Sequence, residues 1–424
     1  MFETFRNAWK VVELRKKILF TLFIIVVFRI GSVIPVPFID VSMLKDASGT
    51  VANEFFNYLS ILTGGGLEYG AIFAMSVTPY INASIIMQLL CVAIPPLERI
   101  AKDGEEGQKR IAKYTRFATV ILGLLQGSAY YWYLSASGYV SVSGGAKVFA
   151  AFVIILSFTA GSALMMWLGE QIDTKGIGNG ISVLLFAGII SRGPQVFNML
   201  LANWKLDKQA AVIGIVLAFL LVIAFIVWMT NAERRIPVQY AKRVVGRKMY
   251  GGQNSHIPIK VNMSGVMPII FASSILMLPT MALSFMKDTT SSMYKILTLF
   301  SVRGVFYAVI YFILIIAFAY FYVTIQYNPV EMANNLRKNS GAIPGIRPGK
   351  PTSDFIQRIL SRITLLGALF LSVIAILPII VGSVGGINVS LGGTSVLIMV
   401  GVALDTVQNL ESQMMMRHYK GFLD

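Results

Sequence analysis

The side chains that usually perform catalysis or bind metals are few in this chain of 424 residues. Its two histidines, His256 and His418, have no cysteine or acidic cluster near them at the spacing of a metal site. The single cysteine, Cys91, excludes an internal disulfide and any site built from several cysteines. No apolar segment carries a serine–histidine or paired-aspartate arrangement suited to hydrolysis. The sequence therefore argues against an enzyme and predicts neither a metal nor a cofactor.

Two further features could be mistaken for reactive sites. The spacing Gly176-x-Gly178-x-Gly180 resembles part of a dinucleotide fingerprint, but no strand precedes it. Close backbone packing at a helix start is the better interpretation. Arg29 and Asp405 are charges inside apolar segments, where charge is costly. We expect Arg29 to pair with a helix carbonyl or polar neighbour and Asp405 to extend toward the membrane surface, rather than to act in transport.

The composition indicates that these residues lie in or between membrane-spanning helices. The chain is 56% hydrophobic and only 13% charged, with a mean hydropathy of +0.70. A soluble protein of this size cannot bury so much apolar surface, so a soluble enzyme is excluded. Because a span needs about 20 apolar residues, we predict ten, at residues 18–37, 70–95, 114–134, 148–169, 177–198, 210–230, 262–286, 304–327, 363–382 and 392–410.

The distribution of positive charge predicts the orientation. With ten spans, 27 of the 36 Lys and Arg residues lie on the side of the two termini, whereas the opposite side holds few, Arg192 among them. The positive-inside rule then makes both termini cytoplasmic. Residues 1–17 read as an amphipathic surface helix without a cleavable signal peptide, and 411–424 as a cytoplasmic tail.

An internal repeat suggests how the spans are arranged. The pattern P-x-I-x-A-S-x-I begins at Pro79 in the second span and at Pro268 in the seventh. Each occurs second in a set of five, so the halves 18–208 and 209–410 would be inverted relative to each other, around a central pathway. Between the first two spans, the apolar stretch 53–63 is too short to cross the membrane. A helix re-entering from outside and a surface helix fit it about equally, and we adopt the former.

Three classes of function remain. A secondary transporter shares inverted repeats but needs polar or charged groups at mid-depth, and an intramembrane enzyme needs a catalytic pair. The predicted pathway is instead mostly apolar, and an aliphatic constriction can gate by excluding water. A conduit with little substrate specificity suits that lining best.

Several motifs, in order along nearly the whole chain, resemble the SecY family of protein-conducting channel subunits. They are Phe28-Arg29-Ile30-Gly31, Ile34-Pro35-Val36-Pro37, Pro79-Tyr80-Ile81, Ala83-Ser84-Ile85-Ile86, Gln88-Leu89-Leu90, Trp167-Leu168-Gly169-Glu170-Gln171-Ile172, Gly176-Ile177-Gly178-Asn179-Gly180-Ile181-Ser182, Tyr240-Ala241-Lys242-Arg243, Lys260-Val261-Asn262-Met263, Pro344-Gly345-Ile346-Arg347-Pro348-Gly349 and Gly392-Gly393-Thr394-Ser395. The resemblance implies an all-α membrane protein of ten transmembrane helices, in two inverted five-helix halves, with a short re-entrant plug helix. Its implied function is to pass unfolded secretory polypeptides across the membrane and to release apolar segments sideways into lipid.

The resemblance also implies three sets of site residues. The family's aliphatic pore ring corresponds to Val77, Ile81, Ile181, Leu185, Ile270 and Ile398, where valine and leucine replace the commoner isoleucine at two positions. The polar residues of its lateral gate correspond to Asn82, Gln88, Asn262 and Ser274, which would hydrogen-bond across the seam. Its plug corresponds to residues 53–66, including Phe55, Phe56, Leu59, Gly64, Gly65 and Gly66.

The implied partners act from several sides. The basic loops 231–261 and 328–362 resemble docking sites for the ribosome and the SecA ATPase, with Arg234, Arg235, Arg243 and Arg347 as contacts. Pro and Gly around Arg347 fix a loop shape that membrane anchoring alone would not require. SecE, SecG, signal-sequence-bearing polypeptides and membrane lipids are the other expected partners. The expected location is the bacterial cytoplasmic membrane.

Overall fold

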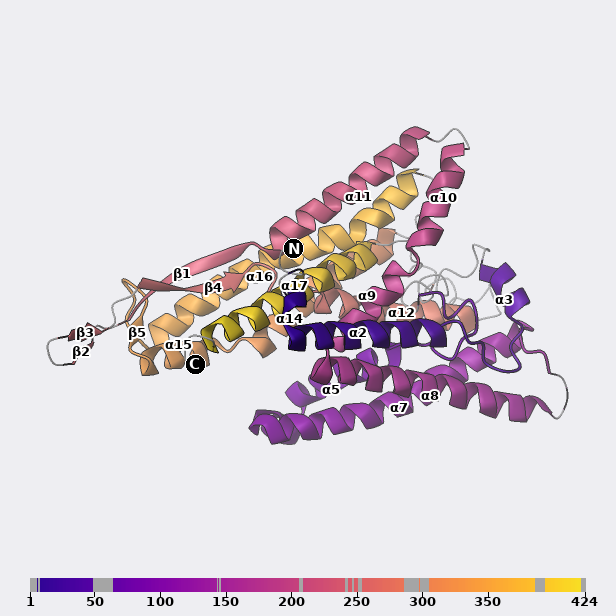
Figure 1. The fold of residues 1–424 in the computed structure, drawn as a ribbon, viewed down its shortest axis with the longest axis horizontal. Helices are drawn as coiled ribbons and strands as arrows, with labels where there is room; N and C mark the ends of the chain where they lie inside the picture. The colour runs from indigo at the N-terminus through magenta and orange to yellow at the C-terminus, as the bar shows by residue number, and fades with distance from the viewer. Residues whose placement is uncertain are drawn as a thin grey trace.

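The computed structural model describes residues 6, 8–48, 64–142, 144, 146–205, 209–240, 243–245, 248–250, 254–285, 297, 305–385 and 393–420. Helices dominate this part of the chain (Figure 1). The predicted plug stretch 53–63, with Phe55, Phe56 and Leu59, lies outside the described residues. It therefore stays a prediction.

The helices follow one another through the two predicted halves. In the first half they are α2 Val12–Gly31, α3 Val41–Ser48, α5 Thr78–Ala93, α6 Pro95–Lys102, α7 Gly104–Ala136, α8 Ala146–Lys175, α9 Gly180–Ile190 and α10 Gly193–Lys205. In the second half they are α11 Gln209–Thr230, α12 Met267–Phe285, α14 Val305–Gln326, α15 Pro329–Lys338, α16 Lys350–Gly385 and α17 Gly393–Lys420. Long apolar runs of good helix formers account for most of them.

Local signals set several helix ends. Pro79 lies in the first turn of α5, where its missing N–H is no loss. Pro95 starts α6 in the same way, and the chain bends by 105° between α5 and α6. Asp40 caps α3 by accepting hydrogen bonds from the side chain of Ser42 (2.5 Å) and from the N–H of Met43 (3.4 Å). These bonds hold the pKa of the Asp40 carboxyl below its usual value.

Each predicted span contains a helix, but the bounds differ. By length and composition alone, five of the described helical stretches could cross a membrane, and the bent pair α5–α6 would make a sixth. The protein is thus a multi-pass membrane protein, whereas the count of ten stays a prediction. Helices α7, α16 and α17 run well beyond the predicted spans into the loops and the tail. Residues 70–77 form turns rather than the predicted start of a span.

Two small β-sheets stand where only loops were predicted. The first pairs β1 Glu233–Tyr240 antiparallel with β4 Asn254–Lys260, and adds β5 Gly341–Ala342 on the other edge of β1. The second pairs β2 Arg243–Val245 with β3 Lys248–Tyr250. In the middle of β1, Ile236 and Val238 are buried and alternate with exposed residues. Both contribute to an apolar cluster that joins the sheet to α15 and the start of α16.

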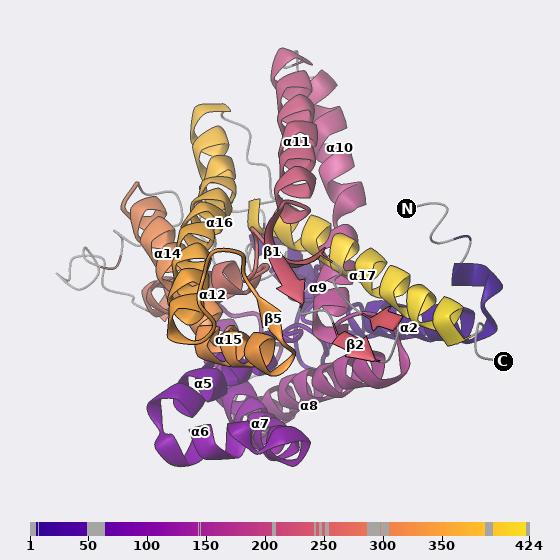
Figure 2. The same cartoon turned by 90° about the vertical axis from the view of Figure 1, so that its left-hand side faces the viewer.

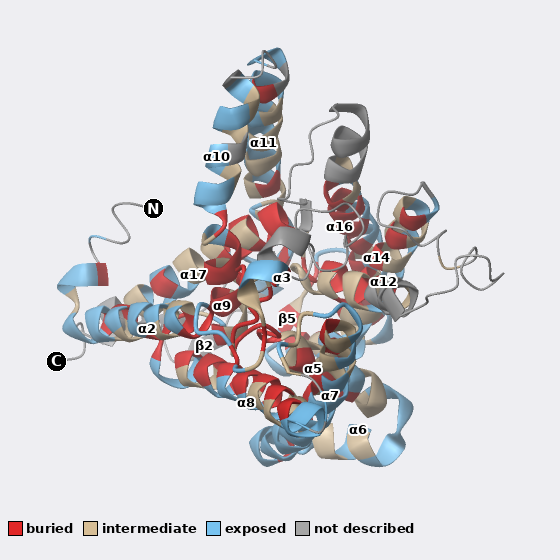
Figure 3. Cartoon of the chain, turned by 90° about the vertical axis from the view of Figure 1, so that its right-hand side faces the viewer, coloured by how far each residue is buried: buried red, intermediate tan, exposed pale blue. Residues whose placement is uncertain are grey.

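Helices α10 and α11 rise away from α5, α6, α7 and α8 (Figure 2). Helix α11 packs against α10 and α17 yet leaves large apolar side chains exposed, at Leu217, Leu221 and Trp228. Buried residues concentrate instead toward the middle of the molecule, around α9 (Figure 3). An apolar surface on a helix of this composition is typical of contact with lipid.

Candidate functional site

One apolar cluster joins the first half of the chain to the second. Its buried members come from α2, the turns before α5, α8, α9 and α17, with partly buried residues of α5 and α12 packed against it. Helix α9 contacts both α2 and α17, so it lies where the halves meet. The cluster includes all six residues predicted for the pore ring, which are Val77, Ile81, Ile181, Leu185, Ile270 and Ile398.

The six side chains differ in burial. Val77, Leu185 and Ile398 are 0%, 4% and 3% exposed, whereas the other three are partly buried. Aliphatic carbon offers no ligand to an ion and excludes water when packed. Four separate segments therefore bring these aliphatic side chains into one cluster. Such a cluster can close a path to water and ions by packing. That these residues line a pore stays a prediction.

The turn before α9 fixes where Ile181 and Leu185 point. Asn179 caps the helix by accepting the N–H of Ser182 (3.1 Å), and Asp173 accepts the N–H of Gly180 (2.7 Å). A Cβ on Gly180 would lie 2.0 Å from the carbonyl oxygen of Gly169. The glycine-rich motif thus allows α8 and α9 to approach closely, which confirms the packing role predicted for it.

Residues 64–77 lead into the cluster as a chain of turns. A Cβ on Gly161 of α8 would lie 2.1 Å from the carbonyl oxygen of Ile72, so this segment runs directly against α8. Ser76 adopts a left-handed φ of 48° and is buried just before Val77. The left-handed residue and the proline after it end the turns and begin α5. This explains why an apolar run that reads as one span is only partly helical.

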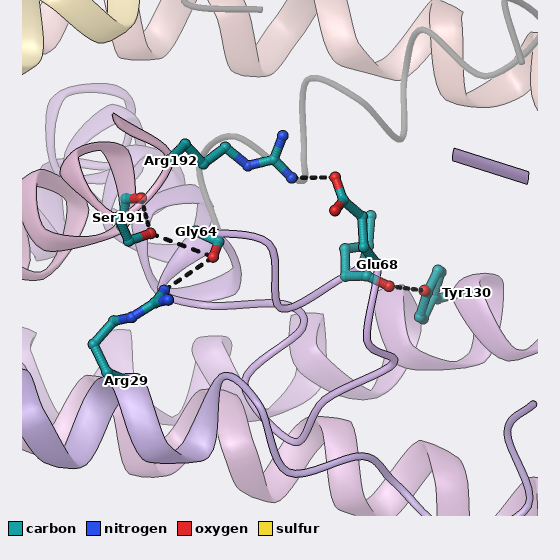
Figure 4. Close-up of polar contacts among 8 residues, drawn as sticks. Arg29, Gly64, Glu68, Tyr130, Ser191 and Arg192 are labelled. Atoms are coloured by element: carbon teal, nitrogen blue, oxygen red, sulfur yellow. Dashed lines mark hydrogen bonds and ion pairs between the residues drawn. The ribbon is translucent and has the colours of Figure 1, made fainter. Parts of the chain in front are cut away.

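Arg29 of α2 bonds to a polar neighbour, which is one of the two kinds of partner predicted for it. Its Nη1 donates to the carbonyl oxygen of Gly64 (3.0 Å), in a turn rather than a helix, and the hydroxyl of Ser191 donates to the same oxygen (3.3 Å; Figure 4). The next residue, Arg192, forms an ion pair with Glu68. Arg192 is only 7% exposed. The sequence predicts it to be one of the charges of an outer loop, but it is buried. No sequence signal marked Arg192 or Glu68, because their pairing joins distant segments.

One of the four predicted lateral-gate residues, Gln88, lines a cavity of about 1020 Å³. The walls of the cavity come from α5, α6 and α7 on one side and from α14, α15 and α16 on the other. Within the described part of the chain, the predicted bonds across the seam are absent. Gln88 donates to Ser84 on its own helix (3.5 Å), and the buried Oδ1 of Asn262 has no partner there. Asn82 and Ser274 are half-buried.

The predicted docking arginines lie on the two small sheets and on the loop between β5 and α16. Arg234 and Arg235 are exposed on β1, where Arg235 pairs with Glu233 (2.7 Å). Arg243 lies on β2 opposite Tyr250. Arg347 is exposed at a loop tip.

Local backbone contacts hold that loop. Gly345 and Gly349 have φ values of 80° and 104°, and Thr352 donates to the Arg347 carbonyl oxygen (2.9 Å). Ile346 packs into the cluster beneath β1. The loop shape that the Pro and Gly residues predicted is therefore built from contacts on both sides of Arg347.

Among the other candidates, Asp405 is exposed on α17. His256 is exposed on β4, opposite Pro237 of β1. Within the described residues, no three His, Cys, Asp or Glu side chains are grouped so as to hold a metal ion.

Comparisons with known proteins cover almost the whole chain. A model of the SecY family matches residues 71–407. A protein translocase subunit SecY from Thermotoga maritima is 42% identical over 430 residues, spanning 100% of this chain and 98% of the relative. The subunit of the same name from Mycobacterium tuberculosis is 40% identical over 445 residues, spanning 100% of both.

Solved structures share the fold at lower identity. One described as "The structure of a protein conducting channel" is 18% identical, with a TM-score of 0.65, and covers 94% of this chain and 92% of that one. Sec61 in the canine ribosome-channel complex from the endoplasmic reticulum is 16% identical, with a TM-score of 0.59, and covers 94% and 92%.

Proposed function

Because the chain belongs to the SecY family, we propose that it forms the protein-conducting channel of a translocase. Unfolded secretory polypeptides cross the membrane through it, and apolar segments leave it sideways into lipid. The observation that carries this proposal is the convergence of six aliphatic side chains, from segments of both halves, in one buried cluster. The family is one of channels rather than enzymes, and nothing favours the transporter alternative.

The mechanism follows from the chemistry of the ring. Packed aliphatic side chains exclude water and ions at rest, because a narrow apolar constriction dewets. The same side chains have no fixed hydrogen-bonding pattern, so they yield to a passing chain of any sequence. Val77, Leu185 and Ile398 would close the path most tightly, since they are the most buried. The plug at residues 53–66 would reinforce this seal from outside.

Lateral release uses the seam between the halves 18–208 and 209–410. The cavity between α5 and α14 supports a path there, because it lies between helices of opposite halves. Since no hydrogen bond joins the predicted gate residues in the described part of the chain, packing would hold the gate shut. Weak closure suits a gate that a signal sequence must part.

The small sheets and the loop after β5 would receive the partners that drive translocation. Arg234, Arg235, Arg243 and Arg347 would contact the ribosome or the SecA ATPase, because arginine binds both phosphate and carboxylate. Both termini would be cytoplasmic in a bacterial plasma membrane, as the positive-inside rule requires. SecE would clamp the two halves together, and SecG would be a third subunit.

The test is to make the ring polar. Ile81→Asn combined with Ile270→Asn places two amides in the cluster and should make resting vesicles permeable to ions, because a polar constriction stays wet. The matched control is Ile86→Asn with Ile275→Asn, on the same two helices at positions that are 42% and 38% exposed. Unchanged permeability in the ring variant, with the protein inserted and folded, would refute the pore assignment.

A further inference from the structure

The carbonyl oxygen of Gly64 accepts hydrogen bonds from two elements far apart in sequence. The guanidinium of Arg29 reaches it from α2 (3.0 Å), and the hydroxyl of Ser191 reaches it from the end of α9 (3.3 Å; Figure 4). The single hydroxyl hydrogen of Ser191 is shared with the carbonyl oxygen of Gly188 (2.6 Å), so its bond to Gly64 is the longer branch of a bifurcated hydrogen bond. A carbonyl with a cationic and a neutral donor is held more firmly than one with a single neutral bond.

Leu67 and Glu68, farther along the turn, are fastened as well. Glu68 forms an ion pair with Arg192, and the hydroxyl of Tyr130 donates to the carbonyl oxygen of Leu67 (3.3 Å). The side chains of Arg192 and Glu68 are only 8% and 20% exposed. Breaking a buried pair leaves an uncompensated charge, so this contact resists opening more than a surface pair would. The turn 64–68 is therefore held by α2, α7 and the end of α9.

The fit at Gly64 is close. Its φ is 65°, and a Cβ there would lie 2.8 Å from the Ser191 hydroxyl and 3.0 Å from the backbone of Gly188. The turn thus lies directly against the C-terminal end of α9. The same short helix carries Ile181 and Leu185 of the aliphatic cluster nearer its start. A rigid helix links the two sites, so moving one end displaces the other.

We propose that Arg29, Ser191 and Arg192 are positioning residues that anchor the turn 64–68 to α2 and α9 and thereby set how readily the channel opens. The inference rests on the proposed function, because it gives the anchor a role in closing that same channel. It also explains why Arg192 is buried and Arg29 is half-buried. An arginine within a membrane span is costly, and here each is matched to a specific acceptor.

The first measurement reports how accessible the turn 64–68 is when no polypeptide substrate is present. The full chain carries Cys91→Ser and Leu67→Cys, a position only 3% exposed, and is reconstituted with its partner subunits in resting vesicles. We measure how fast a membrane-impermeant maleimide reacts with the new thiol. Arg29→Met should raise the rate about tenfold, as expected for local opening after loss of a charge-assisted hydrogen bond. Arg29→Lys, which keeps a charged donor, should restore most of the protection.

The matched control removes another arginine from the same half. Arg116 pairs with Glu170 between α7 and α8 (2.7 Å), and Arg116→Met should leave the labelling rate unchanged. Ser191→Ala removes one neutral donor without removing charge and should raise the rate about threefold. Because this variant is mild, it keeps the test valid if Arg29→Met folds poorly.

The second measurement, resting ion conductance, separates an anchor from a simple fold-stabilising contact. Conductance should rise in step with labelling in Arg29→Met and Ser191→Ala but not in Arg116→Met. Equal labelling and conductance across all variants, in folded protein, would overturn the proposal. Faster labelling without any rise in conductance would overturn its role in closing the channel. Failure of the normal channel to translocate a secretory protein would refute the proposed function instead, and the labelling result would be unaffected.

Discussion

Gly180 offers the sharpest test of how the aliphatic cluster is positioned. It is the first residue of α9, one position before Ile181, and an added Cβ would lie 2.0 Å from the carbonyl oxygen of Gly169. Ordinary contact begins near 3.4 Å, so Gly180→Ala requires the two helices to part by more than an ångström. A backbone carbonyl cannot rotate aside as a flexible side chain can. The displacement must therefore be taken up by α9.

The expected loss follows from overpacking. Enlarging a tightly packed site destabilises by about 1–3 kcal/mol, and a clash with backbone belongs at the upper end. Alanine recovers about 0.5–1 kcal/mol in a helix relative to glycine, which leaves a net destabilisation of about 2 kcal/mol. The displaced helix also carries Ile181 and Leu185 out of register with Ile398. We therefore expect a lower midpoint of thermal unfolding together with increased resting ion conductance.

Gly193 provides the matched control. It too is the first residue of a helix, α10, but a Cβ there meets nothing within 4 Å. Gly193→Ala should leave both the unfolding midpoint and the conductance unchanged or slightly improved. If Gly180→Ala behaved like Gly193→Ala in both assays, the close approach of α8 and α9 would not position the cluster, and the reasoning would be wrong.

Two further predictions concern the entrance to α5 and the docking loop. Ser76 has a left-handed φ of 48° and a buried hydroxyl without a partner among the described residues. Ser76→Gly should stabilise the protein by about 1 kcal/mol, seen as a higher unfolding midpoint, and a decrease would refute the strain. Arg347→Ala should weaken binding of ribosomes or of the cytoplasmic ATPase without changing the unfolding midpoint. Arg337→Ala, at the end of α15, is its control, and equal binding by both variants would exclude Arg347 as a contact.

Apolar runs predicted where the helices lie, because a membrane span must satisfy its own backbone. The prediction from apolar runs was wrong where an apolar segment is not helical. Residues 70–77 read as part of a span, yet they are turns packed against α8. A bilayer-length count does not distinguish an apolar helix from apolar turns that other helices cover. The proline at position 79 was the available signal, since it favours the first turn of a helix.

The small sheets were missed although their sequence carries a signal. Ile236 and Val238 alternate with exposed residues along β1, which is the period of a half-buried strand. Because the charged residues around them are typical of a cytoplasmic loop, the segment was predicted as a loop and the alternation was not used. Helix α16 likewise begins at Lys350, well before the predicted span, because apolar residues of its early turns, Ile356 and Leu360 among them, join the cluster beneath the sheet.

The candidate site was predictable in part. Family resemblance placed six aliphatic residues in the ring, and the fold gathers them in one cluster. Their role in lining a pore stays a prediction. The contacts of Arg29 and Arg192 could not be predicted, because they depend on how α2, α9 and the turn 64–68 meet in space. No spacing along the sequence encodes such a pairing.

The most direct measurement is crosslinking from single cysteines inside the cluster. In a Cys91→Ser background, cysteine replaces Ile81, Ile270 or Ile398 in turn, and a secretory chain is stalled during translocation. Cysteine at the exposed Ile86 serves as the reference. A polypeptide path through the cluster predicts crosslinks from all three ring positions to the stalled chain and few from position 86. An engaged chain that crosslinks from none of the three would contradict the central claim.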